Sequence, residues 1–288
     1  MNRSCRYILI LIPFYLASAL CLVYSPRHVI TMLSAGIAFG SLSSIVLARR
    51  LMFLAAAIPH AALLSVLLAI PISMTFNVDT TAIAIALCLP MVMCVGIAID
   101  RGLDPDTATA IFVASTASLS VIAMYIALTR YPLSYSLWSY IVGDPLLATD
   151  KDAILSLCIA IGVALAVRTV FGHEILSSID RELAILYGAR PTLYTLVIYG
   201  ALAIACVSMV KFVGFVVQHI LILLPATIAS MISESCYSVL TISVSISSIA
   251  ALAGLALAIP LDQAPAGLTG LLLLALYLLT VLRRWRRG

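Results

Sequence analysis

Charge is the scarcest property of this 288-residue chain, because only 10% of its residues are Asp, Glu, Lys or Arg. A soluble domain of this length carries roughly a quarter charged residues. Hydrophobic residues instead make up 64% of the sequence, and the mean hydropathy is +1.19. These values exclude a soluble globular domain and predict an all-α, polytopic bundle of transmembrane helices.

Lysine is nearly absent, and this limits the chemistry of the chain. The two lysines, Lys151 and Lys211, do not follow a glycine-rich loop of the form GxxxxGK[ST]. The chain therefore lacks a Walker phosphate loop, and we expect a transport protein rather than an enzyme that hydrolyses ATP. The motifs GxSxG, HExxH and GxGD are also missing. Energy for uphill transport must then come from a partner or an ion gradient.

The seven cysteines show no CxxC or similar ligand spacing. We interpret them as small apolar residues rather than a disulfide framework or a zinc cluster. The net charge of +4 comes mostly from arginines at the ends of apolar runs, so it does not indicate nucleic-acid binding.

Ten apolar runs divide the chain, and a helix needs about 20 residues to cross a bilayer. The region 193–232 is interrupted only by Lys211, so it contains either two spans or a broken or re-entrant helix. We therefore expect a single transmembrane domain, residues 1–288, with eight to ten spans. The runs cover residues 7–24, 29–48, 51–76, 81–99, 107–129, 153–171, 193–210, 212–232, 237–260 and 268–282.

Arginine placement predicts the orientation. If ten spans alternate, most arginines next to the runs fall on one side, and the positive-inside rule makes that side cytoplasmic. Both termini are then cytoplasmic in a multi-pass protein of the cell membrane, and 130–152 is a long outward loop. The arginines concerned are Arg3, Arg6, Arg49, Arg50, Arg168, Arg181, Arg190, Arg283, Arg284, Arg286 and Arg287.

The cytoplasmic loop at about 172–191 has its own helical pattern. Acidic residues near a helix start and a Gly–Pro ending predict a short capped helix. The segment is too charged to cross a membrane and too apolar for a free loop, so we expect it to lie along a partner protein. The alternative is a surface helix packed on the chain's own loops. The residues that carry the pattern are Asp180, Glu182, Leu183, Ala184 and Gly188.

His60 is the ionisable residue placed deepest in an apolar run. Counted from Leu51, its imidazole lies roughly 15 Å along a helix, near the middle of a hydrocarbon layer ~30 Å thick. An ionisable side chain at that depth marks a transport path or a binding site by default. The alternative is a histidine bonded to a backbone carbonyl in a helix-packing seam.

Five segments together resemble the ABC-3 permeases, the membrane subunits of zinc, manganese and iron ABC importers. RRLMFLAAAIPHAALLS at 49–65 is similar to the family's RRMAFFGDxxAHSALLG-type segment. The likeness continues in order along the chain and covers nearly all of it. The other segments are GLDPDTATAIF at 102–112, YIVGDPLLATDKD at 140–152, IDRELAILYGA at 179–189 and VGFVVQHILILLPATIA at 213–229.

This resemblance implies a homodimeric permease, two cytoplasmic ABC ATPase subunits and an extracellular metal-binding protein that delivers the ion. It implies that the helix at 179–189 couples to the ATPase. No permanently bound cofactor is implied, since the divalent metal (zinc, manganese or iron) is the transported substrate.

One position departs from the family pattern, because the aspartate four residues before the histidine is Ala56 here. That carboxylate would share a helix face with His60 and form a two-ligand site. A second histidine, His219, lies at a similar depth in a later run, next to Gln218. His60 and His219 are therefore the candidate metal ligands of the pore. Alternatively, Gln218 and His219 form hydrogen bonds between helices.

Two other functions compete with metal import. The lost aspartate is compatible with an ABC permease for a metal chelate or a small organic solute. A stand-alone secondary carrier normally keeps acidic residues inside the membrane. Here every Asp and Glu lies at or outside the ends of the apolar runs, which disfavours a carrier.

Overall fold

The computed structural model describes residues 3–131 and 137–286, and over these residues the chain is helical, without strands. Nine helices are long and apolar enough to cross a membrane, and the N-terminal helix is a tenth long helix of 18 residues. This confirms the predicted all-α transmembrane bundle. The elements are α1 (Arg3–Leu20), α2 (Pro26–Ala48), α3 (Met52–Phe76), α4 (Thr80–Asp100), α5 (Pro105–Arg130), α6 (Trp138–Val142), η1 (Pro145–Leu147), α7 (Asp150–Ile179), α8 (Arg181–Leu186), α9 (Pro191–Val213), α10 (Phe215–Ile232), α11 (Cys236–Leu261) and α12 (Pro265–Trp285).

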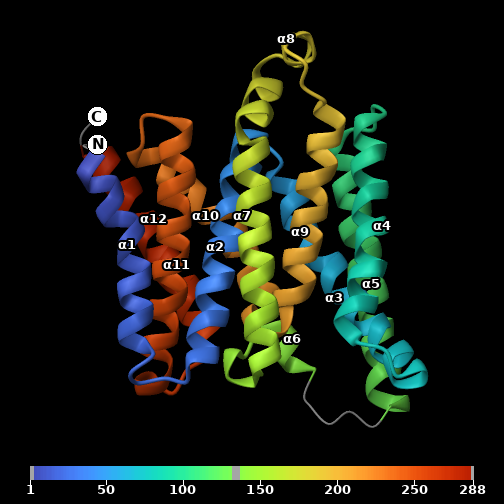
Figure 1. The fold of residues 1–288 in the computed structure, drawn as a ribbon. Coiled ribbons are helices and arrows are strands. Elements are labelled where there is room, and N and C mark those ends of the chain that lie inside the picture. Colours follow the sequence, from blue (N-terminus) through green and yellow to red (C-terminus); the bar gives the residue numbers. More distant parts are fainter. Residues whose placement is uncertain (1–2, 132–136, 287–288) are drawn as a thin grey trace.

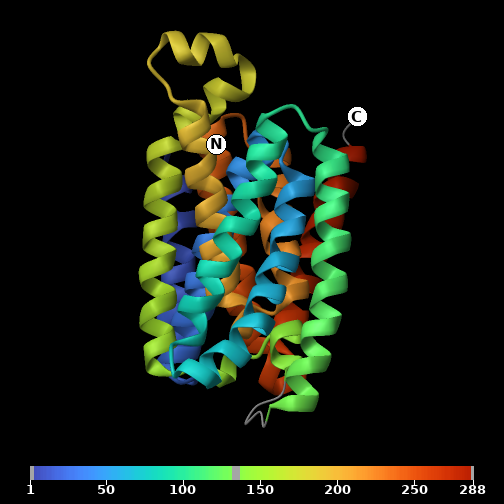
Figure 2. The ribbon, with the colours of Figure 1, turned by 90° about the vertical axis from the view of Figure 1, so that its right-hand side faces the viewer.

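The long helices run alternately up and down, side by side (Figure 1). The start of α1, the end of α12 and the short helix α8 lie at one end of the bundle, which we call the α8 end. The short helix α6 lies at the opposite end, the α6 end. Figure 2 shows α8 projecting beyond the bundle at the α8 end. The two termini therefore share a face, as an even number of long helices requires.

Small residues bring the central helix α2 close to α11. A Cβ added to Gly36 would lie 2.4 Å from the Cα of Ser248, so only glycine permits this approach. Serine hydroxyls add hydrogen bonds, because Ser243 of α11 donates to the Gly40 carbonyl at 2.7 Å. Ser43 of α2 also accepts from the Ala226 amide of α10 at 3.0 Å. Close backbone approach and interhelical hydrogen bonds are the usual means of helix association in membranes.

Two boundaries differ from the sequence-based prediction at the α8 end. Residues His173 to Ile179 do not belong to a loop, because they extend α7 by two turns. Glu174 lies outside the apolar run 153–171, as the sequence analysis states, but it is buried within α7 because the helix continues past the run. The predicted coupling helix is correspondingly shorter and comprises only α8.

The region 193–232 contains two helices with a break at Gly214 rather than at Lys211. Lys211 lies within the last turn of α9, and Gly214 turns the chain with φ = 81°. The link after α6 packs directly on this turn, since a Cβ on Gly143 would lie 2.5 Å from the Gly214 nitrogen. The Asp144 amide also donates to the Lys211 carbonyl at 3.1 Å. The expected outward loop at 130–152 thus contains α6 and η1 and covers the α9–α10 turn.

Candidate functional site

The structure brings His60 on α3 and His219 on α10 together. Their ring centroids are 5.4 Å apart, with the planes at 82°. Phe215 completes the group, 4.7 Å from the His60 ring and 4.8 Å from the His219 ring. We call these three residues the ring cluster. Both histidines are half-buried, so the pair lies at the edge of the chain's packed interior.

The hydrogen bonds of His219 suit metal coordination. Nδ1 lies 2.8 Å from the Phe215 carbonyl oxygen, one turn earlier on the same helix. In a neutral imidazole that donates this bond, Nε2 carries the free lone pair. A histidine that binds a metal usually donates its other N–H to a carbonyl or carboxylate in this way. The ring also contacts the backbone carbonyl of Ala56 on α3, where the resembled family has its aspartate.

The two imidazoles do not make a complete site within one chain. No group of three His, Cys, Asp or Glu residues able to hold a metal occurs among the described residues. Gln218, next to His219, is fully buried, and its side-chain nitrogen donates to the Cys206 carbonyl on α9 at 2.8 Å. The expected hydrogen bond between helices is therefore made by Gln218, and His219 contacts both the Phe215 carbonyl of its own helix and the Ala56 carbonyl of α3.

The predicted coupling residues all map to α8 and its flanks. Asp180 begins the helix by accepting from the Leu183 amide at 2.9 Å. Ala184 is fully buried, whereas Glu182 is exposed and Leu183 is 39% exposed. Gly188 ends the segment with φ = 79°, a conformation that favours glycine. The helix thus packs through Ala184 and presents Glu182 and Leu183 outwards.

Large apolar side chains surround these residues without being covered. The exposed fractions reach 79% for Ile179, 83% for Leu186 and 74% for Tyr187. The short helix α8 that Ile179 precedes and Leu186 ends lies beyond the end of the bundle (Figure 2). An apolar patch with charged neighbours in such a position is typical of a protein-interaction surface.

A polar contact between helices at the α8 end was not predicted from the sequence. Arg49, which follows α2, donates from Nε to the Glu174 carboxylate on α7 at 3.1 Å. Its terminal nitrogen Nη2 donates to the Thr195 hydroxyl on α9, also at 3.1 Å. One guanidinium therefore links three helices. The signal in the sequence was an arginine that ends one apolar run and a glutamate just after another run at the same end of the bundle.

The comparisons with known proteins decide the family. Residues 24–284 match the ABC 3 transport family. The chain belongs to this family. The manganese import permease ScaB of Streptococcus parasanguinis is 25% identical over 226 residues, which cover 78% of each chain. A probable metal transport membrane protein of Thermotoga maritima is 29% identical over 228 residues, again 78% of each. The zinc uptake membrane protein ZnuB of Buchnera aphidicola is 25% identical over 221 residues, which cover 76% of this chain and 82% of that protein.

Two solved structures share the fold. PsaBC from Streptococcus pneumoniae, in complex with a Fab, aligns with a TM-score of 0.76 and 22% identity over 88% of this chain and 89% of that chain. An inward-facing, putative metal-chelate type ABC transporter aligns with a TM-score of 0.74 and 15% identity over 98% and 100%. As an ABC 3 family permease, this multi-pass chain is the membrane subunit of an ABC transporter, and the ATPase is a separate component.

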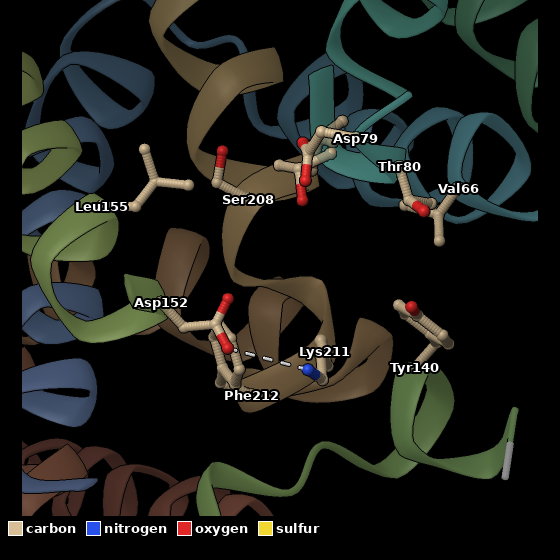
Figure 3. A pocket seen from close by; sticks show the side chains of 11 residues that line it. Val66, Asp79, Thr80, Tyr140, Asp152, Leu155, Ser208, Lys211 and Phe212 are labelled. Atoms are coloured by element: carbon tan, nitrogen blue, oxygen red, sulfur yellow. Dashed lines mark ion pairs between the residues drawn. The ribbon is translucent and has the colours of Figure 1, made fainter. Parts of the chain in front are cut away.

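In this permease a separate polar cavity of about 240 Å³ lies at the α6 end (Figure 3). Asp79 and Asp152 line it, and Lys211 pairs with Asp152 at 3.7 Å, which ties α9 to α7. Val66 borders the cavity six residues after His60, about 240° further round α3. The cavity therefore lies on a different face of α3 from the ring cluster.

Proposed function

We propose that this permease imports a divalent transition metal ion, with manganese or zinc as the first candidates and iron as a third. The ABC 3 family match over residues 24–284 carries this proposal. The names of the relatives support it, because they describe manganese import in ScaB and zinc uptake in ZnuB. An extracellular metal-binding protein would deliver the ion.

His60 and His219 would bind the ion during its passage. Imidazole is a borderline ligand that suits zinc, iron and other transition metals better than magnesium or calcium. Two neutral ligands hold a divalent ion weakly, and a conducting path must release what it binds. In a homodimer the half-buried pairs of two chains would together offer four imidazoles, the ligand number of a tetrahedral zinc site.

Helix α8 would contact the cytoplasmic ATPase. Its exposed Glu182 and Leu183 and the exposed apolar side chains beside them form a compact docking surface beyond the bundle. This assignment makes the α8 end cytoplasmic, with both termini inside the cell. The positive-inside rule agrees, because Arg49, Arg50, Arg181 and Arg190 lie at this end.

A second candidate substrate is a metal chelate or a small organic solute. The observation that favours it is Ala56, which leaves the ring cluster without a carboxylate to balance the charge of a bare ion. A chelated metal brings its own anionic ligands and would not need that carboxylate.

Uptake by proteoliposomes that contain the permease and its ATPase distinguishes these substrates. We expect ATP-dependent uptake of labelled manganese or zinc when the external binding protein is added, and no uptake of magnesium or calcium. Uptake of a metal chelate in preference to the free ions would favour the second candidate. If uptake stops when ATP is left out, the protein is not a secondary carrier, whichever of the two substrates it transports.

A further inference from the structure

Arg49 forms hydrogen bonds to residues of two helices, α7 and α9. The short helix α8 lies between these two helices in the chain. Glu174 lies near the end of α7, shortly before α8, and Thr195 lies near the start of α9, shortly after it. The guanidinium contacts both, at 3.1 Å each. Both stems of the α8 segment are therefore tied to the turn between α2 and α3.

The two stems are also fastened to each other beside this contact. The ring of His173, next to Glu174, stacks on the ring of Tyr194, next to Thr195, with centroids 5.1 Å apart and planes at 23°. The end of α7 and the start of α9 are therefore in contact with each other as well as with Arg49.

The turn that carries Arg49 leads directly to the ring cluster. Three residues separate α2 from α3, and His60 lies on α3. Arg50 within this turn has φ = 55°, a conformation that few residues other than glycine adopt. The turn between Arg49 and the helix of His60 is therefore only a few residues long.

Stability alone does not account for this ion pair. Glu174 is 1% exposed and the Arg49 side chain 17% exposed. Removing a carboxylate from water costs free energy that the pairing only partly restores, so apolar residues of similar volume are often as stabilising. A guanidinium is distinguished by its rigid set of donors, which fixes the direction of two hydrogen bonds at once.

We propose that Arg49 is a positioning residue that transmits movement of α8 to the His60 segment of α3. It makes ATP hydrolysis on the partner subunit change the geometry of the metal ligands. The proposal rests on the proposed docking of the ATPase on α8.

The most specific test removes a single hydroxyl group, that of Thr195. In Thr195→Val the side chain keeps its shape but no longer accepts from Arg49, whereas Thr195→Ser retains the acceptor and serves as the matched control. Arg49→Lys keeps the charge but cannot reach both partners in the guanidinium geometry. The exposed Arg101, which follows α4, provides a further control as Arg101→Gln.

The quantity to measure is metal transported per ATP hydrolysed by the assembled complex in proteoliposomes, together with the effect of the metal on ATP turnover. We expect Thr195→Val and Arg49→Lys to lower the ratio about tenfold, within the usual range of coupling effects, and to remove the response of ATP turnover to the metal. Co-purification of the ATPase should be retained. Thr195→Ser and Arg101→Gln should behave as wild type.

The proposal would be overturned if Thr195→Val and Arg49→Lys both transport as much metal per ATP hydrolysed as wild type. This includes the case in which transport and ATP turnover both fall by the same factor. If Arg49→Lys does not fold, Thr195→Val alone decides. A different result would show that the ATPase does not dock on α8. In that case the ATPase would co-purify normally with a variant in which Glu182 and Leu183 are both replaced by lysine.

Discussion

Single residues account for the chemistry of the ring cluster, and part of it was predictable. The depth of His60 within an apolar run identified it as a ligand candidate, and the depth of His219 suggested that the two could meet. The structure places their rings 5.4 Å apart. Phe215 was missed, although it precedes His219 by four residues and therefore shares its helix face. The bond from His219 to the Phe215 carbonyl depends on side-chain rotamers, which the sequence does not specify.

Ala56 provides a test at the residue scale. Ala56→Asp should tighten metal binding, because a carboxylate one helical turn before His60 adds an anionic ligand on the same face. We expect a roughly tenfold lower Kd, about 1.4 kcal/mol, and slower release. Isothermal titration of the purified complex with manganese and zinc measures the affinity.

The matched control for this change is Ala56→Asn, which has the same shape without the charge. If Ala56→Asn and Ala56→Asp bind the metal as weakly as wild type does, the position does not face the metal. That result would leave the metal at His60 and His219 without a ligand from position 56.

At the scale of elements, the capping residues and their spacing predicted the position of α8. The contacts of the preceding residues determine where α7 ends and α8 begins. Asp180 was recognisable as a helix start, and the structure confirms its bond to the Leu183 amide. The preceding residues extend α7 because Glu174 pairs with Arg49 and His173 stacks on Tyr194. These contacts join residues more than a hundred positions apart or in different helices, so local sequence patterns do not reveal them.

The proposed role of α8 predicts a loss of assembly. Replacing Glu182 and Leu183 together with lysine should abolish co-purification of the ATPase, because it reverses one exposed charge and places another in the apolar patch. The permease itself should still elute as a folded species in size-exclusion chromatography.

The corresponding control replaces Leu146 and Leu147, exposed at the α6 end, with lysine. That variant should assemble normally. Should both double variants retain a full complement of ATPase, the docking surface lies elsewhere than on α8.

Close packing of α2 on α11 gives a stability prediction. Gly36→Ala should lower the free energy of unfolding by about 1–3 kcal/mol, the usual cost of overpacking, because the new methyl group meets the Ser248 backbone. Thermal unfolding in detergent measures the loss. Gly162→Ala on α7 is the control, since its Cβ would meet nothing within 4 Å, and an unchanged or slightly raised melting temperature is expected there. Equal behaviour of the two variants would contradict the described helix contact.

At the scale of the whole molecule, hydropathy was sufficient for the class of the protein and for the number of long helices. Ten apolar runs predicted the ten long helices closely, and an even number explains why the start of α1 and the end of α12 both lie at the α8 end. The short elements were harder to predict. The α6 segment and the Gly214 turn depend on one backbone packing against another, with Gly143 and Gly214 in contact, and residues 132–136 of the expected outward loop lie outside the described residues.

The central claim is that a divalent metal crosses this permease past His60 and His219. It is tested most directly by ATP-dependent metal uptake into proteoliposomes that hold the permease with its ATPase, with wild type, His60→Ala and His219→Ala compared at equal complex content. We predict that His60→Ala abolishes uptake and His219→Ala weakens it, while the ATPase still co-purifies with both. Wild-type uptake rates in His60→Ala would contradict the account and would leave His60 with a packing role between α3 and α10.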